Sequence, residues 1–398
     1  MRFTRLRKFA TDESGFSLVF VGLGGLALVG ASMLAIDVGM LMSARSQAQN
    51  SADAGALAGA IALAYDDYDD RTATGPAVVH AIATAKSNKV QGADVSVEAG
   101  DIEFLNDPAG EPNRVRVTVY RNVARGNPVS TLIAQYFGIK TANISAVAMA
   151  EASPANSMTC VKPFTIPDRW IEKNPTVKPW VVGDDFSRYK QPKGELLNPA
   201  DVYEPQYLPP DYKVANPAYS GYNSESSRGE KLVLRANNGN KIQSSFYFSL
   251  AMTDDTGGSD YEWNIANCNT KIYDWNDPLI QEPGAKEGPT VQGILALIAK
   301  DPGAVWNESA KKVDNSAYGE RQSPRVFPIP LYDPDYYDEG HQTGRVATLR
   351  TANWIGFFVE YVGSGSEIHG RIIPIGGIRN KTMTTGTANM PKAIRLVQ

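Results

Sequence analysis

The chain has 398 residues, of which 42% are hydrophobic and 21% are charged, a composition that suits a folded protein of two or three structural units. This balance excludes a disordered, collagen-like or polytopic membrane protein. The net charge is −4, but without the four basic residues near the N-terminus the chain has 35 basic against 43 acidic residues. An acidic main body argues against nucleic acid as a partner.

An uncharged, mostly apolar stretch of 23 residues runs from Ser14 to Ile36. It exceeds the roughly 20 residues that a helix needs to cross a bilayer, whereas the apolar core of a cleaved secretory signal, the alternative, has only about 7 to 15. We therefore expect one transmembrane helix bounded by Gly15 and Asp37. Because basic residues precede it, the positive-inside rule places a basic tail of residues 1–13 in the cytoplasm and the following domains outside it.

The helical pattern continues past Asp37 and predicts one transmembrane and projecting helix over residues 14–64, since residues 40–64 contain no proline and many alanines. Five small residues fall on one side of this helix, where short side chains allow another helix to approach closely. This stripe packs either on the chain's own globular part or on helices of partner subunits. Its members are Ala48, Ala52, Gly55, Ala56 and Gly59.

The first sixty residues contain an ordered set of positions: Gly15, Asp37-Val38-Gly39, Arg45, Gln49-Asn50, Asp53-Ala54 and Ala56-Leu57-Ala58-Gly59-Ala60. This order resembles the N-terminal module of TadG-like (TadE/G-like) proteins of the tight-adherence, or Flp, pilus assembly system. The resemblance implies a single-pass protein of the bacterial inner membrane with periplasmic domains and no catalytic residues in this module. It also implies that the partners are pilus assembly proteins, pseudopilins and the lipid bilayer.

The sequence departs from some relatives at two points. Related pseudopilins are cut after a glycine and carry Glu at the fifth mature position, whereas the fifth residue after Gly15 is Phe20. Other relatives bind a divalent metal through a D-x-S-x-S motif, which this chain lacks. The resemblance therefore extends neither to ordinary pilin processing nor to that metal site, and we expect no cofactor.

Residues 65–150 are predicted to form a pilin-like α+β domain. The alternation of Val115, Val117 and Val119 with polar residues is typical of a strand that is buried on one face. Helices are expected at 77–90 and 130–137, and strands at 94–97, 101–104, 114–120 and 143–149.

A β-rich α+β domain is expected over residues 151–398, because the composition shifts toward Pro, Trp and Tyr after Ser153-Pro154. Its predicted strands are 231–234, 245–250, 326–329, 354–361 and 368–375, with a helix at 291–298. Residues 394–397 could close its sheet.

Cys160 and Cys268 are the two cysteines of the chain. In an oxidising compartment they are expected to form a disulfide, and the alternative is a pair of buried free thiols. A catalytic thiol would need a nearby histidine base, but none of the three histidines lies in a recognised local motif.

Two acidic clusters could hold calcium or could be solvated turns. Neither has EF-hand spacing. The first comprises Asp254, Asp255, Asp260 and Glu262, and the second Asp333, Asp335, Asp338 and Glu339.

The sequence as a whole favours a membrane-anchored structural or assembly component of a Tad/Flp pilus. The alternative is a minor pilus-tip pseudopilin with an adhesive or ligand-binding C-terminal domain. A secreted hydrolase would need a paired acid and base that the sequence does not reveal. The chain is therefore not expected to be an enzyme.

Overall fold

The computed structural model describes residues 14–397 apart from positions 68, 109, 191–193, 205–219, 225, 238, 253–256, 320–321, 344–348 and 381–389. The basic tail expected for residues 1–13, and Asp254 and Asp255 of the first acidic cluster, lie outside the described residues.

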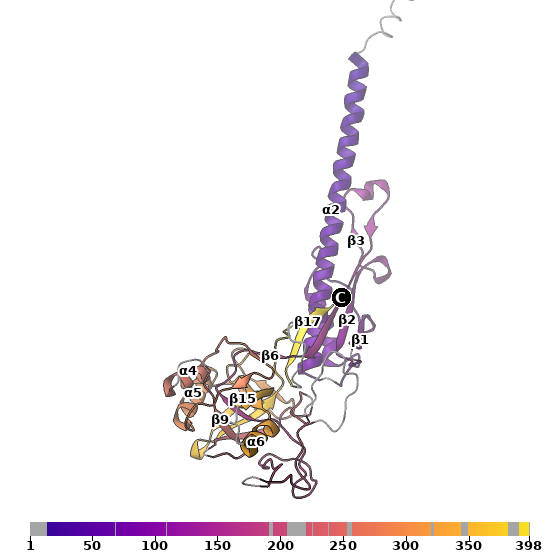
Figure 1. The fold of residues 1–398 in the computed structure, drawn as a ribbon. Coiled ribbons are helices and arrows are strands. Elements are labelled where there is room, and N and C mark those ends of the chain that lie inside the picture. Colours follow the sequence, from indigo (N-terminus) through magenta and orange to yellow (C-terminus); the bar gives the residue numbers. More distant parts are fainter. Residues whose placement is uncertain are drawn as a thin grey trace, which may run out of the picture.

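One long helix, α2 (Ser14–Tyr65), dominates the N-terminal part of the molecule (Figure 1). Its 52 residues span about 78 Å at a rise of about 1.5 Å per residue. The helix is long because no proline interrupts it and alanine is the strongest helix former. It ends where the carboxylate of Asp67 accepts hydrogen bonds from the backbone N–H groups of Asp69 and Asp70 and so stabilises a turn.

The C-terminal half of α2 packs on a second helix and an antiparallel sheet. These elements are α3 (Pro76–Ser87), β1 (Ile102–Leu105), β2 (Arg114–Arg121), β5 (Ile144–Pro154) and β17 (Lys392–Val397). The strand order is β1-β2-β5-β17. Val115, Val117 and Val119 of β2 are fully buried in the core that the sheet shares with both helices. The mixed α+β class is thereby confirmed.

The last strand joins this first sheet rather than closing a sheet of the C-terminal domain. β17 runs antiparallel to β5, with Arg395 opposite Glu151. The buried carboxylate of Glu151 accepts from the guanidinium groups of Arg114, at 2.8 Å, and Arg395, at 3.1 Å. The chain thus returns to the first sheet after building the second unit.

The helix predicted at residues 130–137 is wrong. The structure has a short ribbon of β3 (Val129–Ser130) and β4 (Thr141–Ala142), with a 3-10 turn, η3 (Ala134–Phe137), between them. Gly138, with φ = 90°, ends the turn because this backbone conformation favours glycine. The strand predicted at residues 94–97 is also wrong, since only a bridge between Ser96 and Tyr120 forms there.

Six strands of the second unit close into a small barrel. They are β7 (Phe164–Pro167), β8 (Lys231–Ala236), β9 (Phe246–Ser249), β14 (Val326–Tyr332), β15 (Leu349–Val362) and β16 (Ile368–Ile373). The order β15-β14-β7-β9-β8-β16 returns to β15, with parallel pairs at β14–β7 and β8–β9. A continuous buried cluster fills it, including Phe164, Ile166, Leu232, Ile329, Phe357 and Ile372.

Short elements and three helices surround the barrel. β11 (Pro278–Leu279) extends the sheet beside β15, while β6 (Ser157–Met158) pairs with β10 (Tyr273–Asp274) and β12 (Val305–Asn307) with β13 (Lys312–Asp314). The helices are α4 (Gly258–Ala266), α5 (Glu287–Lys300) and α6 (Pro334–Thr343). Of these, only α5 was predicted. Three further 3-10 turns are η1 (Ala99–Asp101), η2 (Val123–Arg125) and η4 (Ser364–Ser366).

Candidate functional site

The N-terminal part of α2, before Asp37, is an apolar segment whose large side chains are exposed. Within the part of the chain that the structure describes, α2 is the one helix long and apolar enough to cross a membrane, with a window of mean hydropathy 2.2 that is entirely unburied. Leu28, for example, has 72% of its surface exposed. Leaving so many apolar side chains in water is unfavourable, so this segment is compatible with membrane anchoring. Gly15, one expected boundary, lies within the first turn of α2.

Asp37, the other expected boundary, holds a distant loop against the helix. Its buried carboxylate accepts hydrogen bonds from the backbone N–H groups of Leu132 (2.8 Å), Ile133 (3.0 Å) and Ala134 (2.5 Å). These amides lie at the start of η3 and have no helical partner of their own, and an anionic acceptor is the strongest that a side chain can supply. From the sequence, Asp37 was predicted only as the end of the apolar segment, and no local pattern indicated its contact with the loop.

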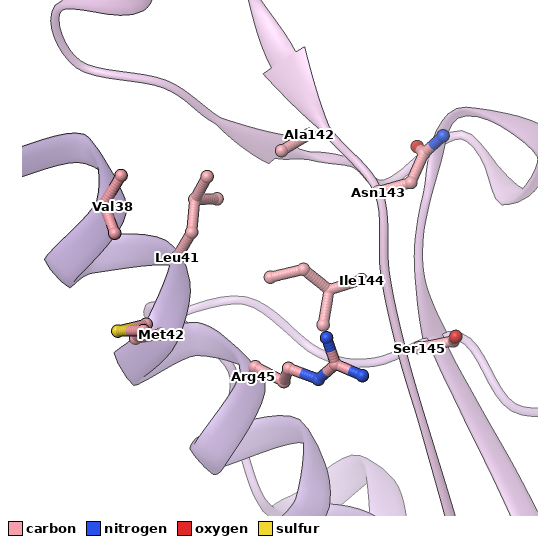
Figure 2. A pocket seen from close by; sticks show the side chains of 8 residues that line it. All are labelled: Val38, Leu41, Met42, Arg45, Ala142, Asn143, Ile144 and Ser145. Atoms are coloured by element: carbon pink, nitrogen blue, oxygen red, sulfur yellow. The ribbon is translucent and has the colours of Figure 1, made fainter. Parts of the chain in front are cut away.

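A shallow pocket lies between α2 and the start of β5, about one turn beyond Asp37 (Figure 2). It encloses about 330 Å³, and its lining consists of Val38, Leu41, Met42, Arg45 and residues 142–145. Figure 2 shows Leu41 and Arg45 pointing from the helix toward Ile144 and Ser145. Because Arg45 is the one charged side chain of this lining, the pocket provides no acid–base pair.

The small-residue stripe of α2 faces the chain's own α3 and β2. Ala48, Ala52 and Ala56 are buried. A Cβ atom at Gly55 would lie 3.0 Å from the Cβ of Ala85, and one at Gly59 would lie 2.8 Å from Cγ1 of Val115. The stripe is therefore filled within the chain, and no free groove remains there for a partner helix.

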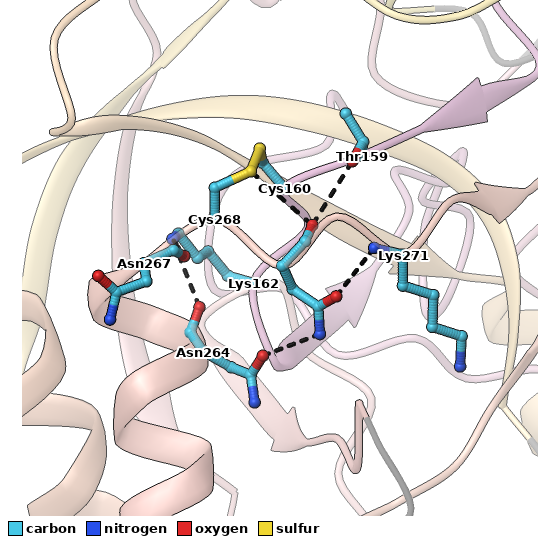
Figure 3. Close-up of a disulfide and its surroundings, with 8 residues drawn as sticks. Thr159, Cys160, Lys162, Asn264, Asn267, Cys268 and Lys271 are labelled. Carbon is cyan, nitrogen blue, oxygen red and sulfur yellow. Dashed lines mark hydrogen bonds between the residues drawn. A yellow bond between two sulfur atoms is a disulfide. The ribbon is translucent and has the colours of Figure 1, made fainter.

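Cys160 and Cys268 form a disulfide with a Cα–Cα distance of 4.4 Å across 108 positions (Figure 3). It ties the segment before β7 to the turn after α4. The backbone N–H of Cys160 also donates to the carbonyl of Asn269, at 3.0 Å. Since both sulfur atoms are in the bond, neither cysteine is a free nucleophile.

Lys162 is buried beside this disulfide, and its ammonium group donates to the carbonyl oxygen of Asn267 at 2.7 Å. Burial, with a smaller contribution from the charge of Lys300, lowers the pKa of Lys162 to about 7. Figure 3 shows its side chain running toward Asn267, at the end of α4. This arrangement joins two elements of the second unit and exposes no reactive amine.

A second buried charge, Asp168, anchors the segment after β7. Its carboxylate accepts from the backbone N–H of Tyr222 at 2.9 Å and from the hydroxyl of Tyr203 at 3.0 Å. Burial raises the pKa of Asp168 to about 6, although these hydrogen bonds oppose the shift. These hydrogen bonds fix the segments of Tyr203 and Tyr222 around Asp168.

Four acidic residues of the two clusters that could hold calcium have other surroundings in the structure. Asp333 pairs with Arg350, and Asp335 pairs with Arg188. Asp338 is buried in α6, while Asp260 accepts from the amide of Asn264. Across the described ranges, no group of three or more His, Cys, Asp or Glu side chains could hold a metal ion.

The three histidines have separate surroundings. His80 lies 3.8 Å from the carboxylate of Asp66, His341 packs on Tyr337, and His369 stacks on Tyr361. Such contacts are ordinary structural ones, and they provide no positive sign of catalysis.

Residues 15–62 match the protein family described as "Putative Flp pilus-assembly TadE/G-like". This range coincides with α2, and the match confirms the resemblance seen in the first sixty residues. Neither a curated protein nor a solved structure matches the chain. The family match supports a component associated with the Tad pilus, and this family is in general structural rather than enzymatic.

Proposed function

We propose that this chain is a membrane-anchored, extracytoplasmic structural or assembly component of a Tad/Flp pilus system, acting by helix packing and protein contacts. One observation carries the proposal. The residues that match the family form the same helix that contains the exposed apolar segment. A rod of this length and composition is stable when lipid surrounds it.

The charge pattern and the disulfide support one orientation. Arg2, Arg5, Arg7 and Lys8 precede the apolar segment, and such residues are retained on the cytoplasmic side. The sheet and the barrel then lie in the periplasm, where a disulfide between Cys160 and Cys268 can form and persist.

Partner contacts would use surfaces other than the small-residue stripe, since α3 and β2 already fill it. The side of α2 that is exposed just beyond Asp37 is the helical surface nearest to the proposed membrane segment. Met42, on that side, has 69% of its surface exposed. We propose that neighbouring pilus proteins contact α2 on this side and within the apolar segment.

The test is intact-mass analysis of the full chain after membrane fractionation of a piliated host, combined with photo-crosslinking from position 42. We expect the uncleaved mass in the inner membrane and crosslinks to pilus components. A photo-crosslinker at the buried position of Ala52 is the matched control and should give none.

Two other results would change the proposal. A mass beginning at Phe16, found in sheared filaments, would favour the alternative of a minor tip pseudopilin that displays the second unit as an adhesive or ligand-binding domain. A protein released into the soluble periplasm would contradict anchoring altogether.

A further inference from the structure

The loop between β3 and β4 presents apolar side chains to the outside. No charged residue occurs from Gly126 to Ile139, a run that includes all of the loop except its last residue, Lys140. Tyr136 and Phe137 have 83% and 76% of their surfaces exposed, and Leu132 and Ile139 are exposed as well. A cluster of large apolar side chains on a short loop is unfavourable in water unless another apolar phase covers it.

The backbone of this loop is well ordered by its own hydrogen bonds. The N–H of Thr131 donates to the carbonyl of Lys140 at 3.1 Å, and the N–H of Ile139 donates to the carbonyl of Ala134 at 3.0 Å. The side-chain amide of Gln135 donates to the carbonyl of Leu132 at 2.8 Å. Internal pairing of this kind is what a segment needs before it can enter an apolar environment.

The loop lies next to the exposed apolar segment of α2. Asp37 fixes the amides of Leu132, Ile133 and Ala134 at the level of α2 where the uncovered apolar segment ends. Figure 1 shows the loop beside α2, above the sheet and on the side of the free rod. The exposed side chains of the loop are therefore continuous with the surface of α2 that requires lipid.

We propose that residues 132–139 form a second membrane contact, inserted in the headgroup–acyl boundary of the leaflet in which the apolar segment of α2 ends. Tyrosine and other amphipathic aromatic side chains are favoured at this depth, and Lys140 follows at the place where a cation can meet anionic headgroups. Two contacts fixed to each other by Asp37 would set the tilt and rotation of the sheet above the membrane. This inference rests on the proposed anchoring by α2.

The experiment uses the full chain in nanodiscs of phosphatidylethanolamine and phosphatidylglycerol, with or without doxyl-labelled phosphatidylcholine. Because both native cysteines are in the disulfide, a single introduced cysteine can carry an environment-sensitive NBD label. The labelled variants are Tyr136→Cys and Ile139→Cys in the loop, Leu28→Cys in the apolar rod and Ile280→Cys, exposed on the second unit.

We expect blue-shifted emission and doxyl quenching at positions 28, 136 and 139, and neither effect at position 280. The loop should be quenched best by a doxyl group near the headgroup, and position 28 by one deep in the acyl chain. Quenching at position 28 but at neither loop position would overturn the second membrane contact. The exposed apolar side chains of the loop would then be expected to bind a protein partner. Absence of quenching at position 28 would instead contradict the anchoring itself.

Discussion

The hydroxyl of Tyr65, the last residue of α2, donates a hydrogen bond of 2.9 Å to the backbone carbonyl of Lys392, the first residue of β17. This bond joins the end of α2 to a strand 327 positions later in the chain. It lies where the chain comes back from the barrel to the first sheet, and it joins β17 to α2 within the first unit.

Replacement of Tyr65 by Phe should weaken this link while keeping the ring. We expect the free energy of unfolding of the first unit to fall by about 1 kcal/mol, the usual net contribution of one such bond. Thermal unfolding of the detergent-solubilised full chain measures the change. Tyr361→Phe is the control, because its ring is half exposed and stacks on His369. Equal losses in both variants would argue against a specific role for the Tyr65 hydroxyl.

The close approach of α2 to β2 and α3 predicts a position-dependent effect of bulky residues on α2. Gly59→Leu should lower the unfolding free energy of the first unit by about 1 to 3 kcal/mol, because even its Cβ would lie 2.8 Å from Cγ1 of Val115. Gly25→Leu is the matched control, since no atom lies within 4 Å of a Cβ built there. Circular dichroism during heating distinguishes them, and an unchanged melting temperature for Gly59→Leu would show that the packing of α2 on the sheet is wrong.

Some of this arrangement could be predicted from local sequence, and some could not. The alanine-rich run and the alternation of Val115, Val117 and Val119 are periodic signals within one element, and α2 and β2 formed as expected. The region 130–137 lacks such a signal. Its apolar residues suggested a helix, but they are the exposed side chains of a turn whose start is fixed by Asp37, more than 90 positions away.

In the barrel, too, pairings between distant strands could not be predicted from local sequence patterns. Most of its strands were expected, but β7, with only four residues, was missed, and its pairing with β9 and β14 completes the ring. The destination of β17 was missed for a related reason. A strand of residues 392–397 can pair with any open edge, and nothing in its own pattern selects β5.

The hydrogen bonds between Asp37 and the β3–β4 loop predict that removing this carboxylate changes the loop without unfolding the protein. In Asp37→Ala, the amides of Leu132, Ile133 and Ala134 lose their acceptor, and we expect their hydrogen exchange to accelerate roughly tenfold or more. Asp53→Ala is the control on the same helix, because Asp53 accepts only from the side chain of Gln49 in the described contacts. Hydrogen exchange measured by mass spectrometry on peptides covering residues 129–142 tests the prediction. Unchanged exchange in Asp37→Ala would refute the proposed hold of Asp37 on this loop.

The disulfide is expected to stabilise the second unit. A cross-link that closes a loop of 108 positions restricts the unfolded chain, and the chain-entropy relation gives about 4 to 5 kcal/mol for such a loop. The double substitution Cys160→Ala with Cys268→Ala should therefore lower the melting temperature of this unit markedly. Thiol alkylation of the unfolded, unreduced wild-type chain should find no free thiol, and two alkylated cysteines would contradict the bond.

Lys162 predicts a pH dependence of stability. Burial lowers its pKa in the folded chain to about 7, below its value of about 10.5 in the unfolded chain. Between these values the unfolded chain binds one proton more than the folded chain, so the contribution of Lys162 to the free energy of unfolding rises with pH from 7 toward 10.5. Below pH 7 both states are charged and this contribution is constant.

The comparison of wild type with Lys162→Met isolates this effect. Met keeps the long apolar stem but has no amine to titrate, so the wild-type free energy of unfolding should increase relative to that of the variant as the pH is raised from 7 to 9. Urea titrations at intervals across this range give the difference directly. If the difference stayed constant with pH, the amine of Lys162 would have the same pKa in the folded and unfolded chain, and its burial next to Asn267 would be contradicted.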